Sequence, residues 1–338
     1  MLFRNENPIL GPSTQIASAT GSVFSLLPSG LALANPPGNV YVVGNANDTN
    51  LSYIAAKYGG TRYADNSLMF QSSIQAAINA CVDLRGDVVL IGPRTYTPTT
   101  PILFNKKGIT VSALFDFGGA QDNGERTTID SQATADIAAV IVSEPCTISG
   151  LGFSSANTVA TGTGGAIVLG PGSGFDGGNF VHIANCRFTN WGDGAYGIAS
   201  NYNDYLKINH CDFDGTVNGD GGSANNVFDA GINIIQGHYV TIEENTFRGC
   251  TYAIQHGTPN PATASHSNKN FIYKGNRVMV ANGTEKFIDF NTLATYSQSW
   301  GLVADNWLGT ATNATSYNDT VANAKTGGVT FSGNHYAE

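Results

Sequence analysis

A six-residue pattern that recurs at nearly regular intervals is the feature that most constrains the fold of this chain. It reads apolar, any residue, turn former, Asn or a small residue, any residue, apolar. Seven copies begin at Ile148, Ile183, Ile208, Ile242, Tyr273, Val303 and Phe331. Their fourth positions are 35, 25, 34, 31, 30 and 28 residues apart. A repeat of this length, with two short apolar strands around a bend, is typical of a solenoid in which each turn of chain packs on its neighbours.

The fourth position of the repeat changes from apolar to polar along the chain. Its occupants are Leu151, Cys186, Cys211, Asn245, Asn276, Asn306 and Asn334. The third position holds residues that tolerate positive φ, so each copy is predicted to turn sharply there. Stacked at a strand spacing of about 4.8 Å, the Asn side chains would join in an amide ladder, and the thiols would stack likewise. We therefore predict a structural ladder of Cys186, Cys211, Asn245, Asn276, Asn306 and Asn334.

A second family of strands follows each bend. Its members are the segments 164–170, 196–201, 230–236, 252–257 and 286–291. Aligning them on a shared Ile places Val168, Ala199, Asn233, Gln255 and Asp289 in one outward column. The lengths between the two families vary, as expected where insertions leave a coil at its corners. The sequence thus predicts an all-β, single-stranded, right-handed parallel β-helix over residues 101–338.

The region before the repeat predicts one helix. Residues 65–81 keep the three-four spacing of an amphipathic helix, and Asp65 or Asn66 can cap its start. Strands are expected in 85–97 and 101–113. Such a helix would close the open end of the solenoid. We predict an N-terminal arm over 1–58, a capping α-helix with the first rung over 59–100, and the β-helix over 101–338.

Three of these segments are IQAAINAC (74–81), VVLIGPRTYT (88–97) and KKGITVSA (106–113). Followed by the Asn-bearing rungs, they resemble the pectate-lyase-like superfamily, which includes many phage tailspikes, over residues 60–338. The resemblance implies the parallel β-helix fold. It specifies function weakly, since that fold hosts lyases, hydrolases, adhesins and structural proteins. The calcium-binding acids and catalytic Arg of pectate lyases have no counterpart here, so lyase activity is not predicted.

Composition excludes several classes of function. The net charge of −9 argues against nucleic acid or an anionic membrane as partner. No stretch is apolar over the length of a membrane span. The apolar segment 22–34 lies deep in the chain without a basic flank, so no signal peptide is predicted. The five cysteines include no CxxC pair and the six histidines lack metal-ligand spacing, so no metal or cofactor is predicted.

The outward column supplies the candidate site. Asn233, Gln255 and Asp289 form a polar stripe, which a glycan could bind with the help of the aromatic residues Trp191, Tyr196, Tyr202 and Tyr205. Asp289 and Asp229 are weak candidates for the two carboxylates of a glycosidase. The alternative, which stays open, is that these polar residues form an ordinary solvated face of the sheet.

These observations lead to a hypothesis about function. A protein released by lysis as part of a virion needs no secretion signal, so we expect a phage virion surface protein. It would be a short tailspike, adhesin or capsid decoration protein, homotrimeric, attached to other virion proteins through residues 1–58 and able to bind host surface polysaccharide. The alternatives are a polysaccharide depolymerase that uses Asp229 and Asp289 and, in last place, a secreted bacterial adhesin.

Overall fold

The computed structural model describes the chain in thirteen segments. They are residues 38–44, 68–71, 73–114, 126–130, 138–154, 165–170, 179–189, 196–215, 228–256, 267–279, 286–290, 297–309 and 328–336. The chain divides into two compact units, Met1–Thr95 with Lys106–Thr127 and Tyr96–Asn105 with Thr128–Glu338. The short strand β4 (Thr95–Tyr96) lies in the sequence where the first unit gives way to the second.

The first unit contains a parallel sheet and the helix. The strands pair in the order β2, β1, β3, β6, and their bounds are β1 (Val40–Val43), β2 (Leu68–Gln71), β3 (Val88–Ile91) and β6 (Ile109–Ala113). Strand β1 lies between β2 and β3, so this part of the arm predicted over 1–58 belongs to the folded sheet. The other residues of the predicted arm lie outside the described segments, apart from the few that flank β1.

Helix α3 (Ile74–Ala80) is shorter than the helix predicted over 65–81. The side chain of Ser73 caps it by accepting a hydrogen bond from the backbone N–H of Ala76 at 3.1 Å. Residues 68–71 are instead a strand, because they pair in register with β1. The helix contacts β1, β2 and β3 through its buried apolar face. Asp65 and Asn66 lie outside the described residues, and the role of α3 as a cap for the β-helix stays a prediction.

A buried carboxylate organises the first unit. Asp87 accepts hydrogen bonds at 2.7 Å from the backbone N–H groups of Asn39 and Val82 and from two nitrogens of Arg85. Burial acts to raise the pKa of Asp87, but these hydrogen bonds outweigh it and hold the pKa below the ordinary value of 3.8. A side chain at Gly38 would meet the Asp87 carboxylate at 2.3 Å, so only glycine fits there.

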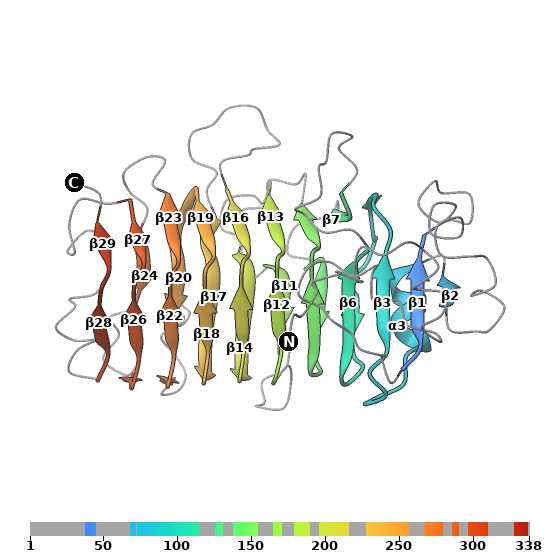
Figure 1. Ribbon diagram of the computed structural model, residues 1–338, viewed down its shortest axis with the longest axis horizontal. Coiled ribbons are helices and arrows are strands. Elements are labelled where there is room, and N and C mark those ends of the chain that lie inside the picture. The colour runs from blue at the N-terminus through green and yellow to red at the C-terminus, as the bar shows by residue number, and fades with distance from the viewer. Residues whose placement is uncertain are drawn as a thin grey trace, which may run out of the picture. The chain divides into compact units, whose positions relative to one another are not determined.

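The second unit is a parallel β-helix built of three parallel sheets (Figure 1). Each full turn of the chain adds one strand to the third sheet, then one to the first and one to the second, as in β14, β15 and β16. The first sheet contains β9 (Cys146–Ser149), β12 (His182–Ala184), β15 (Lys207–Asn209), β18 (Thr241–Glu243), β22 (Ile272–Lys274), β26 (Leu302–Ala304) and β28 (Thr330–Ser332). This is the fold that the repeat predicted.

The other two sheets follow the same order. The second sheet contains β7 (Thr128–Asp130), β10 (Gly152–Ser154), β13 (Arg187–Thr189), β16 (Asp212–Asp214), β19 (Thr246–Arg248), β23 (Arg277–Met279), β27 (Trp307–Leu308) and β29 (His335–Tyr336). The third contains β5 (Ile102–Phe104), β8 (Val140–Val142), β11 (Gly165–Leu169), β14 (Tyr196–Asp204), β17 (Phe228–His238), β20 (Cys250–His256) and β24 (Lys286–Asp289). Strands β21 (Ser267–Lys269) and β25 (Ser297–Ser299) continue from the end of β17.

The interior consists of columns of equivalent residues. The register of the second sheet stacks four rings, which we call the inner phenylalanine ladder: Phe153, Phe188, Phe213 and Phe247. Their ring centroids are 5.2, 4.6 and 4.8 Å apart, and the planes are nearly parallel. All four rings are buried. Parallel strands place like side chains directly above one another, which is why a sequence repeat becomes a ladder.

From β12 onward, each rung turns two corners on a single residue with positive φ. Between the first and second sheets these residues are Gly150, Asn185, His210, Glu244, Gly275, Asp305 and Gly333. Between the third and first sheets they are Phe180, Tyr205, Tyr239, Asn270, Trp300 and Gly328. At both corners the next residue is directed to the interior. The first set coincides with the third position of the sequence repeat.

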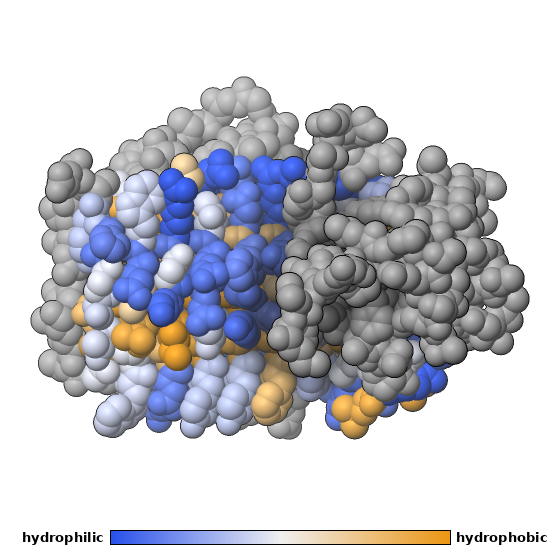
Figure 2. All heavy atoms as spheres, viewed as in Figure 1, coloured by the Kyte–Doolittle hydropathy of each residue, from blue (hydrophilic) through white to orange (hydrophobic). Residues whose placement is uncertain are grey.

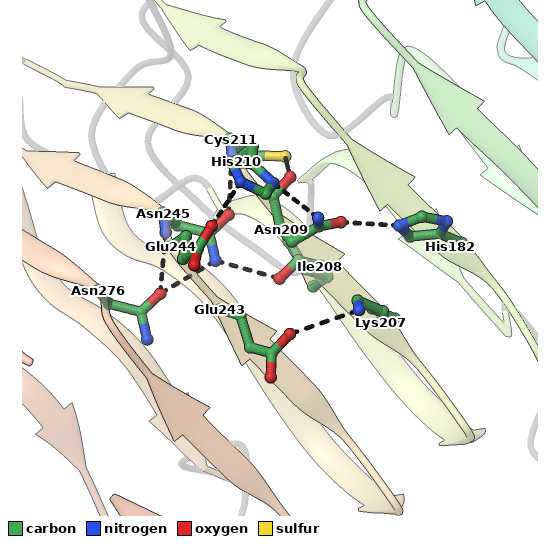
Figure 3. A network of polar contacts seen from close by, with 10 residues as sticks. All are labelled: His182, Lys207, Ile208, Asn209, His210, Cys211, Glu243, Glu244, Asn245 and Asn276. Carbon is green, nitrogen blue, oxygen red and sulfur yellow. Dashed lines mark hydrogen bonds and ion pairs between the residues drawn. The ribbon is translucent and has the colours of Figure 1, made fainter. Parts of the chain in front are cut away.

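An amide ladder follows the first of these corners, and Figure 3 shows its first link, from Asn245 to Asn276. Asn245 donates to the Oδ1 of Asn276 at 3.0 Å, Asn276 to that of Asn306 at 3.0 Å, and Asn306 to that of Asn334 at 2.8 Å. Each of the four also donates to a backbone carbonyl and accepts a backbone N–H from the preceding rung. The side-chain amides therefore satisfy one another and the backbone of the turn.

The cysteines extend this column toward the N-terminus. Cys186 and Cys211 occupy the ladder position in the two rungs before Asn245, and the backbone N–H of Cys211 donates to Asn245 at 2.9 Å. All five cysteines are free and buried. Burial raises the pKa of Cys146 to about 12 and that of Cys211 well above its usual value, so these thiols stay protonated and pack as small apolar groups.

Candidate functional site

The candidate site lies on the outer face of the third sheet. Strand pairing aligns Val168 with Ala199, Ala199 with Asn233, Asn233 with Gln255 and Gln255 with Asp289. The five positions that the sequence alignment placed in one outward column are thus neighbours on successive strands. The residues on either side of them, such as Ile232 and Ile234 in β17, are buried in the interior.

The polar end of this column is covered from solvent. We call Asn233, Gln255 and Asp289 the polar column; their side chains are only 1%, 8% and 7% exposed. Leu103, at the apolar end of the same column, is 44% exposed. Three outward polar groups are therefore partly desolvated, which is unlike an ordinary solvated face.

The polar column leaves hydrogen-bonding capacity unused. Gln255 donates through Nε2 to the Oδ2 of Asp289 at 3.2 Å. Among the described residues, neither the Oδ1 of Asn233 nor the Oε1 of Gln255 has a hydrogen-bond partner, although both atoms are buried. A buried carbonyl oxygen without a donor costs about 1–3 kcal/mol. Both acceptors are covered, so a ligand that carries hydroxyl or N–H groups would satisfy them only by displacing the groups that cover them.

Aromatic residues flank the column. Tyr196 is buried and packs with Ala199 and Ala230, against which Val168 and Tyr252 also pack. Tyr202, six residues further along β14, is half-buried and lies opposite Gln236 of β17. Trp191, the third predicted aromatic contact, lies outside the described residues.

The two predicted catalytic residues have backbone positions that lie far apart in the sheet. Asp229 lies in β17 and Asp289 in β24, with β20 between them, and the register puts Asp289 level with Asn233. The backbone positions are thus offset by four residues, about 13 Å, along the strands and by two strand spacings, about 9.6 Å, across them. Glycosidases hold their carboxyl groups about 5–9.5 Å apart. This geometry favours binding over hydrolysis by the pair.

The outer face of the first sheet carries a chain of polar contacts (Figure 3). Asn209 joins His182 and His210, each at 2.7 Å, and His210 contacts Glu244 at 2.5 Å. Glu243 points elsewhere and pairs with Lys207 at 3.4 Å, so the adjacent Glu243 and Glu244 diverge as expected. On the side of the molecule drawn in Figure 2, hydrophilic residues cover much of the described surface. Among the described residues, no three His, Cys, Asp or Glu side chains are placed to hold a metal ion.

Sequence reasoning missed a charged cluster on the second sheet. Arg187 lies 3.4 Å from Asp212 and 3.6 Å from Asp214, and Arg248 lies 3.5 and 3.8 Å from the same two carboxylates. These are neighbours on β13, β16 and β19. Opposite charges directly across strands stabilise a sheet by about 0.2–1 kcal/mol a pair. The cluster contains two positive and two negative side chains, and their pairing across the strands explains it as a structural feature of the sheet.

Sequence reasoning named Tyr205 but missed the exposed aromatic stack to which it belongs, at the corner between the third and first sheets. Phe180 and Tyr205 have ring centroids 4.6 Å apart with planes 3° from parallel, and Tyr205 and Tyr239 are 4.8 Å apart at 4°. We call these three residues the outer aromatic ladder. They are 62%, 47% and 50% exposed. A signal was present, because each lies six residues before the fourth position of its repeat.

Comparisons with known proteins give the following. No protein-family model and no curated protein matches the chain. Among solved structures, the ORF18 protein of Geobacillus virus E2 is 14% identical with a TM-score of 0.33, over 78% of this chain and 55% of that one. The present chain thus spans about half the length of that viral protein. An alginate lyase from Paenibacillus sp. str. FPU-7 is 14% identical with a TM-score of 0.35, over 78% and 70% of the two chains.

A third similar structure is the DFA-IIIase of Arthrobacter chlorophenolicus A6. It is 15% identical with a TM-score of 0.40, over 88% of this chain and 76% of that one. All three TM-scores are below 0.5, so the fold assignment rests on the strand pairing of this chain. That pairing gives the parallel β-helix that the resemblance to pectate-lyase-like proteins implied. Within the described residues, no helix has the length and apolar character needed to cross a membrane.

Proposed function

We propose that this protein binds a glycan along the outer face of the third sheet, with the polar column as the central contact. The observation that carries the proposal is the pair of buried acceptors, Asn233 Oδ1 and Gln255 Oε1, that lack donors on an outward column. Sugar hydroxyl groups are donors of the required kind. Asp289 adds a charged acceptor beside Gln255.

The proposed activity is binding rather than cleavage. The separation of Asp229 and Asp289 along and across the strands is too wide for a glycosidase pair. A polysaccharide depolymerase is the second candidate, since Asp289 is a covered carboxylate on the same face. The two are distinguished by the release of reducing ends from a bound polysaccharide. We expect none, and release that Asp289→Asn abolishes would establish the depolymerase instead.

The setting we propose is the surface of a phage virion, as a short tailspike, an adhesin or a capsid decoration protein. A rigid coil of rungs that displays one face over its length supports a role in attachment. Residues 1–58, apart from the buried strand β1, would contact other virion proteins, and the protein would be a homotrimer of about three times 35.4 kDa. Immunogold labelling of particles locates it on tail or head, and sedimentation gives its mass. Unlabelled particles would remove the virion setting.

The glycan site is tested by substitution on the outer face. Gln255→Leu removes one acceptor and the hydrogen bond to Asp289, and should weaken binding to an immobilised host polysaccharide about tenfold, the equivalent of one hydrogen bond. Glu243→Gln on the first sheet is the matched control, because it changes an outward residue on another face. Equal binding by wild type and Gln255→Leu would overturn the proposal.

A further inference from the structure

The aromatic column at the corner between the third and first sheets is interrupted at one rung. Its residues, one per rung, are Phe180, Tyr205, Tyr239, Asn270 and Trp300, all with φ between 54° and 59°. The register is continuous through the interruption, since His238 pairs with Lys269 and Lys269 with Ser299 just before these corners. Asn270 therefore occupies the place of a ring between Tyr239 and Trp300.

The gap between Tyr239 and Trp300 is wide enough for one ring. Successive rings of the outer aromatic ladder are 4.6 and 4.8 Å apart. Tyr239 and Trp300 are two rungs apart, which corresponds to about 9.6 Å. A ring placed midway would therefore lie at stacking distance from both neighbours. Asn270, which is exposed, lies at the base of this space.

Folding explains only in part why aromatic residues occupy this corner. A bulky residue with positive φ costs about 1–2 kcal/mol relative to Gly or Asn. Stacking on Tyr205 offsets part of that cost for Tyr239, but Trp300 is 75% exposed, so burial offsets little of it there. Asn270 and Gly328 in the same column show that residues suited to this conformation are accepted here. Exposed aromatic residues in a strained conformation point to a ligand that uses their faces.

We propose that Tyr239, Asn270 and Trp300 form a slot for one pyranose ring. A pyranose presents C–H groups on both faces and hydroxyl groups around its rim. The slot would match this with an aromatic side chain in the rung on either side and, between them, an amide that donates and accepts. An aromatic side chain of a partner protein would fill the space but leave that amide unpaired.

The slot adds a subsite to the proposed glycan site and rests on that proposed function. Tyr239 directly follows the end of β17 and lies six residues after Asn233, a distance of about 20 Å. Both subsites thus belong to the same rungs, one on the sheet face and one at its edge. An extended oligosaccharide that lies along β17 would reach from one to the other.

The decisive variant fills the slot. Asn270→Tyr completes the aromatic column, and Tyr is already tolerated at the same φ in the two preceding rungs. We expect the melting temperature to change by no more than a few degrees and saccharide affinity to fall at least tenfold. Phe180→Asn is the matched control, because it alters the far end of the ladder and leaves the slot intact. Affinity is measured by tryptophan fluorescence, with hexaoses of β-1,4-glucose, α-1,4-glucose and β-1,4-N-acetylglucosamine as probes.

The outcomes separate this inference from the proposed function. A saturable emission change that disappears in Trp300→Ala and in Asn270→Tyr supports the slot. Undiminished affinity in Asn270→Tyr overturns it, and if Gln255→Leu still weakens binding, the glycan site on the third sheet stands alone. No emission change with any of the three hexaoses also overturns the slot. A response to p-cresol without a response to sugar would overturn it in favour of an aromatic side chain of a partner.

Discussion

Two aromatic ladders run through the same rungs of the β-helix, one inside and one outside. Phe213 and Tyr205 belong to one rung, and Phe247 and Tyr239 to the next. Between these two rungs the ring centroids are 4.8 Å apart in both ladders. The inner rings are buried and the outer rings are about half exposed.

The two ladders have the same ring spacing, but different interactions stabilise them. The inner ladder removes four Phe side chains from water, and this burial stabilises the fold directly. The outer ladder gains only the ring contacts, of about 0.5–1.5 kcal/mol a pair, against the strain of positive φ. The fold positions the outer rings without depending on them, so they are free to serve a ligand.

The largest expected effect is on the inner ladder. Phe213→Ala should lower the free energy of unfolding by about 3–5 kcal/mol, because it leaves a cavity between Phe188 and Phe247. Urea unfolding at 25 °C measures the change. A loss below about 1 kcal/mol would show that the inner and outer ladders are energetically alike and would remove the contrast between them.

The amide ladder gives an intermediate case, since it is buried but polar. Asn276→Ala deprives the side chain of Asn245 of its acceptor and the carbonyl of Ile242 of its donor. We expect a loss of about 2–4 kcal/mol by the same urea measurement. Asn334→Ala, at the partly exposed end of the ladder, is the control and should lose less. Equal losses would mean that position within the ladder does not matter.

The first unit provides a comparison that depends on charge. Because the pKa of Asp87 is lower in the folded protein than in the unfolded chain, its contribution to stability is present above the unfolded value near 3.8. It is lost as pH falls through the folded pKa. Thermal unfolding between pH 7 and 2 should show this loss, and Asp87→Asn should flatten it. The two ladders contain no titrating group in this range, so their substitutions should have the same cost throughout.

The smallest expected effect is on the outer ladder. Tyr205→Gly should change the free energy of unfolding by less than about 1 kcal/mol, because the loss of two ring contacts is largely offset by the removal of the Cβ, which disfavours the positive φ at this corner. Paired with Phe213→Ala in the same rung, it tests the contrast directly. A loss of about 3 kcal/mol would show that the outer ladder is structural.

The structural features that recur from rung to rung could be predicted from the sequence. The amide corner was predictable because a positive φ and an inward side chain both restrict residue choice at positions such as Gly275 and Asn276. The outward column was predictable because Ile232 and Ile254 set the register. The helix start was wrong, because residues 68–71 pair with a strand far away in sequence. The burial of the polar column depends on tertiary packing, which no local pattern contains.

The outer ladder was missed for a different reason. The six-residue repeat begins three residues after this corner, so its pattern does not include the corner. Exposed aromatic residues such as Tyr205 are common singly, and only their alignment distinguishes them. Asp229 and Asp289 were paired by their distance in rungs, without the four-residue offset along the strands that separates them.

The one-residue corner gives the outer edge of the β-helix a fixed spacing between side chains. Because each rung contributes a single side chain to the outer edge, order in the sequence becomes position on a line, in steps of about 4.8 Å. Inserting or deleting one whole rung would move two recognition elements apart or together by one step and leave every local contact unchanged. Descendants of this chain could thus match ligands of different repeat length by gaining or losing rungs, with the chemistry of each binding residue preserved.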